Sequence, residues 1–99
     1  MSSTLLKTTV IGNVGESRKI THGGDTFLAV TVAVDSPVKG EPPEWVELIL
    51  GQGYMNLEPY LVKGKRVYAE GRSRSHMFKK QDGSPGFITK VRVRDINLL

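Results

Sequence analysis

A strict alternation of side chains over residues 27–34 constrains the fold more than any other feature of the sequence. Leu28, Val30, Val32 and Val34 fall on one side of an extended chain, and smaller residues mostly fall on the other. A period of two residues is typical of a β-strand with one face against a core. We therefore predict a strand with its even-numbered residues in the core. Its opposite face is open to close approach by a ligand or another chain.

Other segments show similar short strand patterns, separated by turns rich in glycine and proline. The Asp82-Gly83 pair is typical of a hairpin turn before the last strand. The loop at residues 36–44 contains three prolines, which cannot donate to a strand ladder. The predicted strands cover residues 8–14, 27–34, 45–50, 66–74 and 87–93.

Residues 51–64 have a helical spacing, with Leu57 and Leu61 four residues apart. We predict a short helix with Asn56 as its N-cap, Pro59 in its first turn and Gly64 after its end. The predicted element order is therefore three strands, one short helix and two strands.

This order matches the five-stranded oligonucleotide-binding (OB) barrel, in which a helix falls between the third and fourth strands. We expect an all-β fold: a five-stranded OB-fold barrel with one short helix between strands 3 and 4. A two-sheet sandwich usually needs about seven strands and is the less favoured alternative. No linker or repeat divides the chain, so we expect residues 1–99 to form a single domain.

Positive charge is concentrated towards the C-terminus. Residues 1–62 carry four basic and seven acidic side chains, whereas residues 63–94 carry ten basic and two acidic side chains. Most of the candidate phosphate contacts fall in rows along predicted strands, which favours a phosphate-binding surface over ordinary solvated charge. These candidates are Arg72, Arg74, Lys79, Lys80, Lys90, Arg92 and Arg94.

Four of the seven aromatic side chains stand beside basic or polar residues or turns. Burial in the core is the default for any single ring. An exposed ring can instead stack on a nucleobase, which contributes about 1–3 kcal/mol and tolerates any sequence. Phe78, which precedes two lysines, is the strongest candidate. The candidate stacking residues are Trp45, Phe78, Tyr54 and Phe87.

The sequence offers no residues in a pattern that supports catalysis or metal binding. It has no cysteine, and His22 and His76 lack clustered acidic neighbours. Neither a Gly-x-Ser-x-Gly elbow nor a phosphate-binding loop motif is present. We interpret Glu41, Glu44 and Glu47 as solvated charge or a subunit contact. We therefore expect a protein that is not an enzyme and needs no cofactor or metal.

The first residues lack the pattern of a signal peptide, and the longest apolar stretches are only three or four residues. We therefore expect a cytoplasmic, nucleoid-associated protein with no membrane partner.

Several segments together carry a family resemblance over nearly the whole chain. They are residues 9–15, 27–33, 44–45, 60–64, 67–74 and 96–99, with the hairpin around Asp82-Gly83. In these segments the chain resembles the bacterial-type single-stranded DNA-binding proteins, a homotetrameric family with an OB fold. The resemblance implies sequence-independent binding of single-stranded DNA in replication, recombination or repair. It also implies that Trp45 and Phe78 stand where the family places stacking tryptophans.

The same resemblance and the first strand both indicate assembly of the protein into oligomers. The unpaired edge of this strand could form hydrogen bonds with the same strand of a second copy of the chain. We expect a homo-oligomer, with a tetramer implied by the family and a dimer as the smaller alternative. Replication proteins are further possible partners.

Two features depart from the family pattern. Near Val38 and Leu50-Gly51 the chain lacks aromatic residues of the family, so we expect weaker binding per subunit unless Tyr54 substitutes. The sequence also stops at Leu99, without the linker and acidic tip of the family. We therefore expect a tail-less or truncated member that does not recruit partners through such a tip.

Three other functions remain as alternatives at this point. A primosome or replisome adaptor would make mainly protein contacts and bind DNA or RNA more weakly. An RNA-binding or cold-shock-type barrel would prefer RNA. An oligosaccharide-binding barrel fits least, because saccharides do not require a net charge of +8 over residues 63–94.

Overall fold

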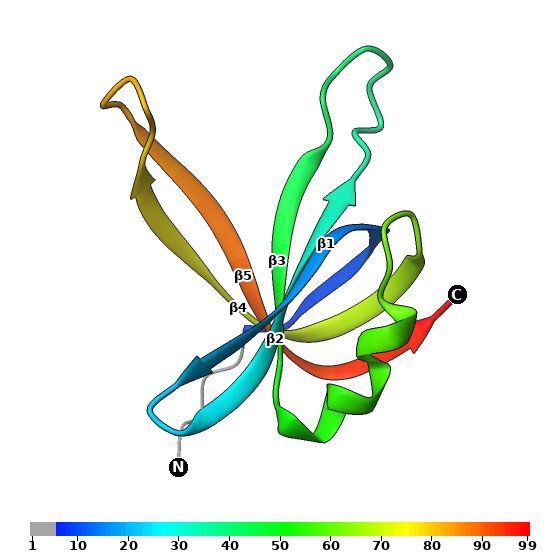
Figure 1. Ribbon diagram of the computed structural model, residues 1–99. Helices are drawn as coiled ribbons and strands as arrows, with labels where there is room; N and C mark the ends of the chain where they lie inside the picture. The colour runs from blue at the N-terminus through cyan, green and yellow to red at the C-terminus, as the bar shows by residue number, and fades with distance from the viewer. Residues whose placement is uncertain (1–5) are drawn as a thin grey trace.

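The computed structural model describes residues 6–99, which form five strands and one short helix around a common core (Figure 1). The elements in chain order are β1 (Thr8–His22), β2 (Asp25–Val34), β3 (Glu44–Leu50), η1 (Gln52–Tyr60), β4 (Arg66–Lys79) and β5 (Pro85–Leu98). The strands close into a barrel in the order β1-β2-β3-β5-β4. The predicted five-stranded barrel with a helix between its third and fourth strands is thus confirmed. None of the helical structure in residues 6–99 is long and apolar enough to span a membrane.

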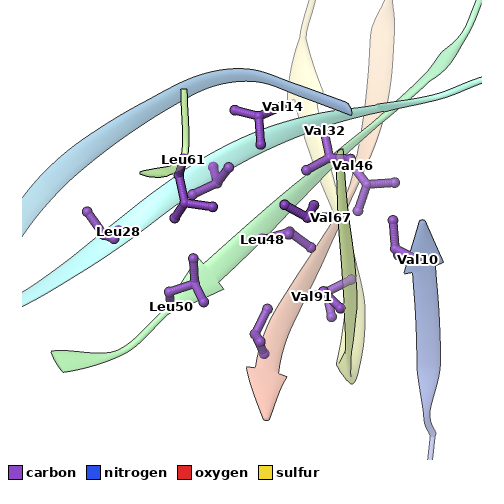
Figure 2. Packing of buried hydrophobic residues seen from close by; sticks show 13 residues of the cluster. Val10, Val14, Leu28, Val32, Val46, Leu48, Leu50, Leu61, Val67 and Val91 are labelled. Atoms are coloured by element: carbon purple, nitrogen blue, oxygen red, sulfur yellow. The ribbon is translucent and has the colours of Figure 1, made fainter. Parts of the chain in front are cut away.

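Alternate residues of the strands build the barrel core (Figure 2). Leu28, Val30 and Val32 of β2 are fully buried, which confirms the face predicted from the alternation. Val34, at the end of that strand, is only partly buried and packs against the edge of the core. The side chains that alternate with these three lie on the outer face of the sheet. Ala29 among them is covered by its neighbours, whereas Phe27 and Thr31 are partly exposed.

Strand β1 continues to His22, well beyond the predicted end at Val14. A register shift between Val14 and Glu16 places one extra residue, Gly15, in this strand. A β-bulge of this kind bends the strand and reverses which residues face the core. A Cβ on Gly15 would lie only 2.6 Å from the Trp45 ring, so any other residue there would displace the ring.

The helix differs from the predicted one in type and in both ends. It is a 3-10 helix that follows Gly51, has no side-chain cap, and contains Pro59 near its end rather than in its first turn. The backbone N–H of Tyr54 donates to the carbonyl of Gly51 at 3.0 Å, a bond across three residues. Because 3-10 helices repeat every three residues, the spacing of four did not locate the N-cap at Asn56.

Beyond the barrel, β4 and β5 continue as a two-stranded projection, here called the arm and comprising residues 75–88 (Figure 1). At its tip the carboxylate of Asp82 accepts hydrogen bonds from the N–H of Ser84 at 2.9 Å and from its hydroxyl at 2.6 Å. These bonds stabilise the ionised form and hold the pKa of Asp82 below its ordinary value of 3.8. The turn keeps the two strands of the arm in register.

Candidate nucleic-acid interface

A groove of about 900 Å³ crosses the outer face of the sheet. Side chains from all five strands line it, so the barrel as a whole fixes its shape. Its lining combines five basic residues with apolar side chains and a single acidic residue. The lining residues are Leu6, Arg18, Ile20, Phe27, Glu47, Ile49, Arg72, Ser73, Arg74, Ser75, His76, Lys90 and Arg92.

Four of these basic residues form two directly opposed pairs across β4 and β5. Arg72 lies opposite Arg92, and Arg74 lies opposite Lys90. We call these four residues the basic cluster. Like charges placed directly opposite each other are unfavourable in a sheet. A bound anion would relieve this repulsion, so the arrangement suits a ligand with several phosphates.

Acidic side chains of the protein neutralise little of the charge of the basic cluster. Among the described residues, the structure gives no ion pair to Arg72, Arg74 or Arg92. Lys90 makes one, with Nζ at 3.7 Å from a carboxylate oxygen of Glu47. Most of the positive charge therefore remains available to a ligand.

Phe78 continues the outward-facing row of β4 into the arm, two residues beyond His76. Its ring packs against Gly86, opposite it on β5, where a Cβ would lie 2.6 Å from the ring's Cζ. The same Cβ would lie 3.0 Å from Cε of Lys80, which places that lysine near the ring. Phe78 is 48% exposed, so part of its ring surface remains open to a nucleobase.

Trp45 shows a similar arrangement and, like Phe78, lies outside the lining of the groove. It lies on β3, on the outer face shared by Glu47 and Ile49, and its ring packs against Gly15 of β1. It is also 48% exposed. An aromatic ring supported by a glycine on one side and open on the other offers a flat surface for stacking.

Phe87 and Lys79 lie on the opposite face of the arm. Phe87 is paired with Met77, one position away from the pair formed by Phe78 and Gly86, and neighbouring pairs point to opposite faces. Phe87 and Met77 are each 70% exposed. The structure therefore does not bring Phe78 and Phe87 together, and a stacking role for Phe87 stays a prediction.

Tyr54 and Arg94 also lie away from the groove. Tyr54 is partly buried against the core, and its hydroxyl donates to the carbonyl of Arg94 at 2.7 Å. Arg94 falls at a register shift in β5 and lines a second, smaller hollow of about 610 Å³ together with Arg72 and Arg92. Their roles in DNA binding stay predictions.

Sequence reasoning missed some residues of the groove and misjudged another. Arg18 was missed because β1 was predicted to end before it. Phe27 and Ile49 belong to outer faces that alternate with core positions, and this alternation is the signal that could have identified them. Glu47, interpreted above as solvated or in a subunit contact, is instead only 7% exposed within the chain itself.

The described part of the chain brings together no group of three or more acidic or histidine side chains that could hold a metal ion. The groove itself offers cations, the ring of Phe27 and apolar surface for binding.

Comparisons with known proteins agree with this geometry. The model of the single-strand binding protein family matches residues 5–99. Single-stranded DNA-binding protein 1 of Xylella fastidiosa is 27% identical over 107 residues, which cover 98% of this chain and 79% of that protein.

Two solved structures are similar over almost the whole chain. The mitochondrial single-stranded DNA-binding protein Rim1 of Saccharomyces cerevisiae superposes with a TM-score of 0.71 at 28% identity, covering 97% of this chain and 96% of that one. The Plasmodium falciparum SSB, solved in complex with single-stranded DNA, superposes with a TM-score of 0.72 at 26% identity, covering 100% and 98%.

Proposed function

The chain belongs to the single-strand binding protein family, and from this we propose that it binds single-stranded DNA, largely independently of sequence and without catalysis. The observation that supports this most directly is the outer face of the sheet, where the basic cluster lines the groove and two partly exposed rings, Trp45 and Phe78, lie outside the groove lining. Phosphates and unpaired bases are the two parts of a nucleic-acid strand that this combination can bind.

The basic and the aromatic side chains are expected to bind different parts of the strand. The basic cluster neutralises phosphates whatever the sequence, which releases counterions and makes binding depend on salt. Trp45 and Phe78 stack on bases, and every base has a face that can stack. In a duplex these faces are already occupied by neighbouring bases, so single strands are preferred.

A salt-dependent titration with labelled dT oligonucleotides of several lengths tests this function. With four phosphate contacts from the basic cluster, the logarithm of the affinity should fall with the logarithm of salt at a slope of about −3. Duplex DNA of the same length is the control and should bind more weakly. No binding to any oligonucleotide at low salt would refute the function.

Assembly into a homo-oligomer is part of the same proposal. Between described residues, the first part of β1, residues 8–12, pairs only with β4, and its pairing with β2 begins at Asn13. The open edge can pair with the same segment of a second chain across a two-fold axis. We propose a tetramer on the family resemblance, with the dimer as its smaller unit. Sedimentation of the samples used for titration gives the mass of the binding unit.

We also propose a cytoplasmic location with the DNA and roles in replication, recombination or repair, where unpaired strands arise, with replication proteins as further partners. The relatives named above are single-stranded DNA-binding proteins, which favours this function over the primosome adaptor. Tight salt-dependent binding of dT in the titration would support the same choice.

A further inference from the structure

An aromatic side chain lies within the groove itself. Phe27 of β2 lines the groove, whereas Trp45 and Phe78 lie outside its lining. Phe27 is partly exposed and lies on the face of β2 opposite to the buried Leu28 and Val30. Among the described residues, the partly buried side chains that pack against the barrel core do not include it. The ring is therefore available to a ligand in the groove.

Apolar side chains flank the ring on the two neighbouring strands. Ile20 of β1 lies directly opposite Phe27, and Ile49 of β3 lies opposite Ala29, one diagonal step away. Diagonal neighbours on one face of a sheet are about 7–8 Å apart, which is within reach of an aromatic side chain. The groove lining includes Ile20, Phe27 and Ile49. We call these three residues the apolar end of the groove.

The side of Phe27 that faces β3 is open. In the ladder between β2 and β3, Leu28 pairs with Leu50, so the next residue, Gly51, comes beside Phe27. The backbone of Gly51 is extended, with φ −69° and ψ −176°. A Cβ on Gly51 would meet nothing within 4 Å. The absence of a side chain at this position therefore leaves room for a flat ligand beside the ring.

Two cations of the groove lining lie next to the apolar end. Arg18 precedes Ile20 by two residues on β1, and Arg92 of β5 lies opposite Ile49. Arg18 shares its charge with Glu47, at 3.8 Å between Nη2 and a carboxylate oxygen, whereas Arg92 has no ion pair among the described residues. A nucleotide combines a flat base with an anionic phosphate, and surfaces for both are adjacent here. The apolar end therefore suits a nucleobase whose phosphate reaches Arg92.

The apolar end is well separated from Trp45. Trp45 lies opposite Ala33, six residues after Phe27 on the same face of β2. Six residues span about 20 Å along a strand. Between these two positions, Lys90 and Arg92 of β5 lie beside β3. A DNA strand that follows β2 and β3 would therefore meet a ring near each end of this path and cations between them.

We propose that Phe27 is a further base-stacking residue, which together with Ile20 and Ile49 forms a nucleobase site at the end of the groove remote from the arm. The base lies against the Phe27 ring, in the open space on the side of β3. The adjoining phosphate contacts Arg92. This proposal rests on the proposed function and adds a fixed position for one base to it.

The test compares the unaltered protein with Phe27→Leu, which keeps an apolar side chain in the groove but removes the ring. Anisotropy of a labelled dT oligonucleotide should show binding weaker by at least about fivefold, as expected for the loss of one stacked base. Phe27→Tyr keeps a ring and should bind within about twofold of the unaltered protein. Tyr60→Leu is the matched control, because it removes an exposed ring that does not line the groove, and it should keep the affinity.

A strand of the same length without bases separates stacking from other effects of the substitution. Phe27→Leu should lose affinity for dT but not for this abasic strand, measured at low salt where phosphate contacts alone support binding. Equal weakening for both strands would overturn the proposal, because the ring would then act only through the shape of the groove. Unchanged affinity of Phe27→Leu for dT would also overturn it, while leaving single-strand binding intact.

Crosslinking of the unaltered protein gives a second readout that does not depend on the folding of a variant. Irradiated strands that contain iodouracil form adducts with aromatic side chains stacked on that base, and mass spectrometry identifies the modified residues. We expect an adduct at Phe27. Adducts at Trp45 and Phe78 with none at Phe27 would overturn the site. Failure of the unaltered protein to bind any single strand would refute the proposed function itself.

Discussion

The two faces of the β4–β5 hairpin are built from the same strands yet differ in almost every property that matters for binding. The front face carries the basic cluster and Phe78, and it is continuous with the groove. The back face of the arm carries Met77 and Phe87 as a cross-strand pair. Neighbouring residues in the sequence are thus divided between two different surfaces.

The comparison shows that exposure alone does not identify a stacking residue. Phe87 is more exposed than Phe78, at 70% against 48%. Phe78, however, is supported by Gly86 and lies on the face that leads to four cations. A nucleic-acid strand needs rings and cations on the same side, and the front face offers Phe78 with four cations, whereas the back face of the arm offers Phe87 with Lys79.

Removing both supported rings should have the largest effect. We expect the double variant Trp45→Ala, Phe78→Ala to lose about 2–6 kcal/mol of binding free energy, because each ring contributes about 1–3 kcal/mol by stacking. Since Trp45 is the single tryptophan of the chain, anisotropy of a labelled dT oligonucleotide is the suitable measurement.

The back face supplies the matched control for this experiment. The double variant Met77→Ala, Phe87→Ala removes two large exposed side chains from the same arm. If only the front face binds, its affinity changes by less than about 0.5 kcal/mol, whereas the stacking role predicted for Phe87 from the sequence requires a loss of about 1–3 kcal/mol. An equal loss in both double variants would mean that the strand wraps around the arm, and the distinction between the faces would then fail.

Removing two cationic side chains from the front face should weaken binding less than removing both rings. It should also change the salt dependence of binding. We expect Arg72→Ala, Arg92→Ala to weaken binding to all sequences alike, by about 2 kcal/mol at 0.1 M salt, because two phosphate contacts are lost. The salt slope should become less negative by about 1.4. Titration of dT at several salt concentrations measures both quantities.

The control for charge is Lys39→Ala, Lys63→Ala, which removes two exposed cations that do not line the groove. Its salt slope should remain close to that of the unaltered protein. An equal change of slope in both variants would show that net charge, rather than the basic cluster, determines the affinity.

The front and back faces also show which features of the structure could be predicted from the sequence. Alternation within one strand identified Leu28, Val30 and Val32 as core, because this pattern depends only on the strand itself. It also grouped Arg72 with Arg74. The Asp82-Gly83 turn indicated that the last two strands pair, but their register, and with it the opposition of Arg72 and Arg92, could not be derived from one strand.

Irregularities explain most of the remaining differences. The extra residue in β1 at Gly15 reverses the alternation, so the pattern in the sequence ends there although the strand continues through Arg18. A second register shift near Gly71 separates Arg94 from the row of Lys90 and Arg92. The burial of Glu47 depends on neighbours from two other strands, β2 and β5, which no local pattern reports.

The smallest effect is expected from a variant that keeps the ring of Phe78 but disturbs its packing against Gly86. In Gly86→Ala the new methyl group would lie 2.6 Å from Cζ of Phe78, so the ring must tilt away from the position it now holds. We expect a loss of about 1 kcal/mol in dT binding, part of the stacking of one base. Gly53→Ala is the control, because a Cβ there meets nothing within 4 Å. Binding of Gly86→Ala at full strength would show that Phe78 stacks without a fixed orientation, and support by a glycine would then no longer distinguish the front face from the back.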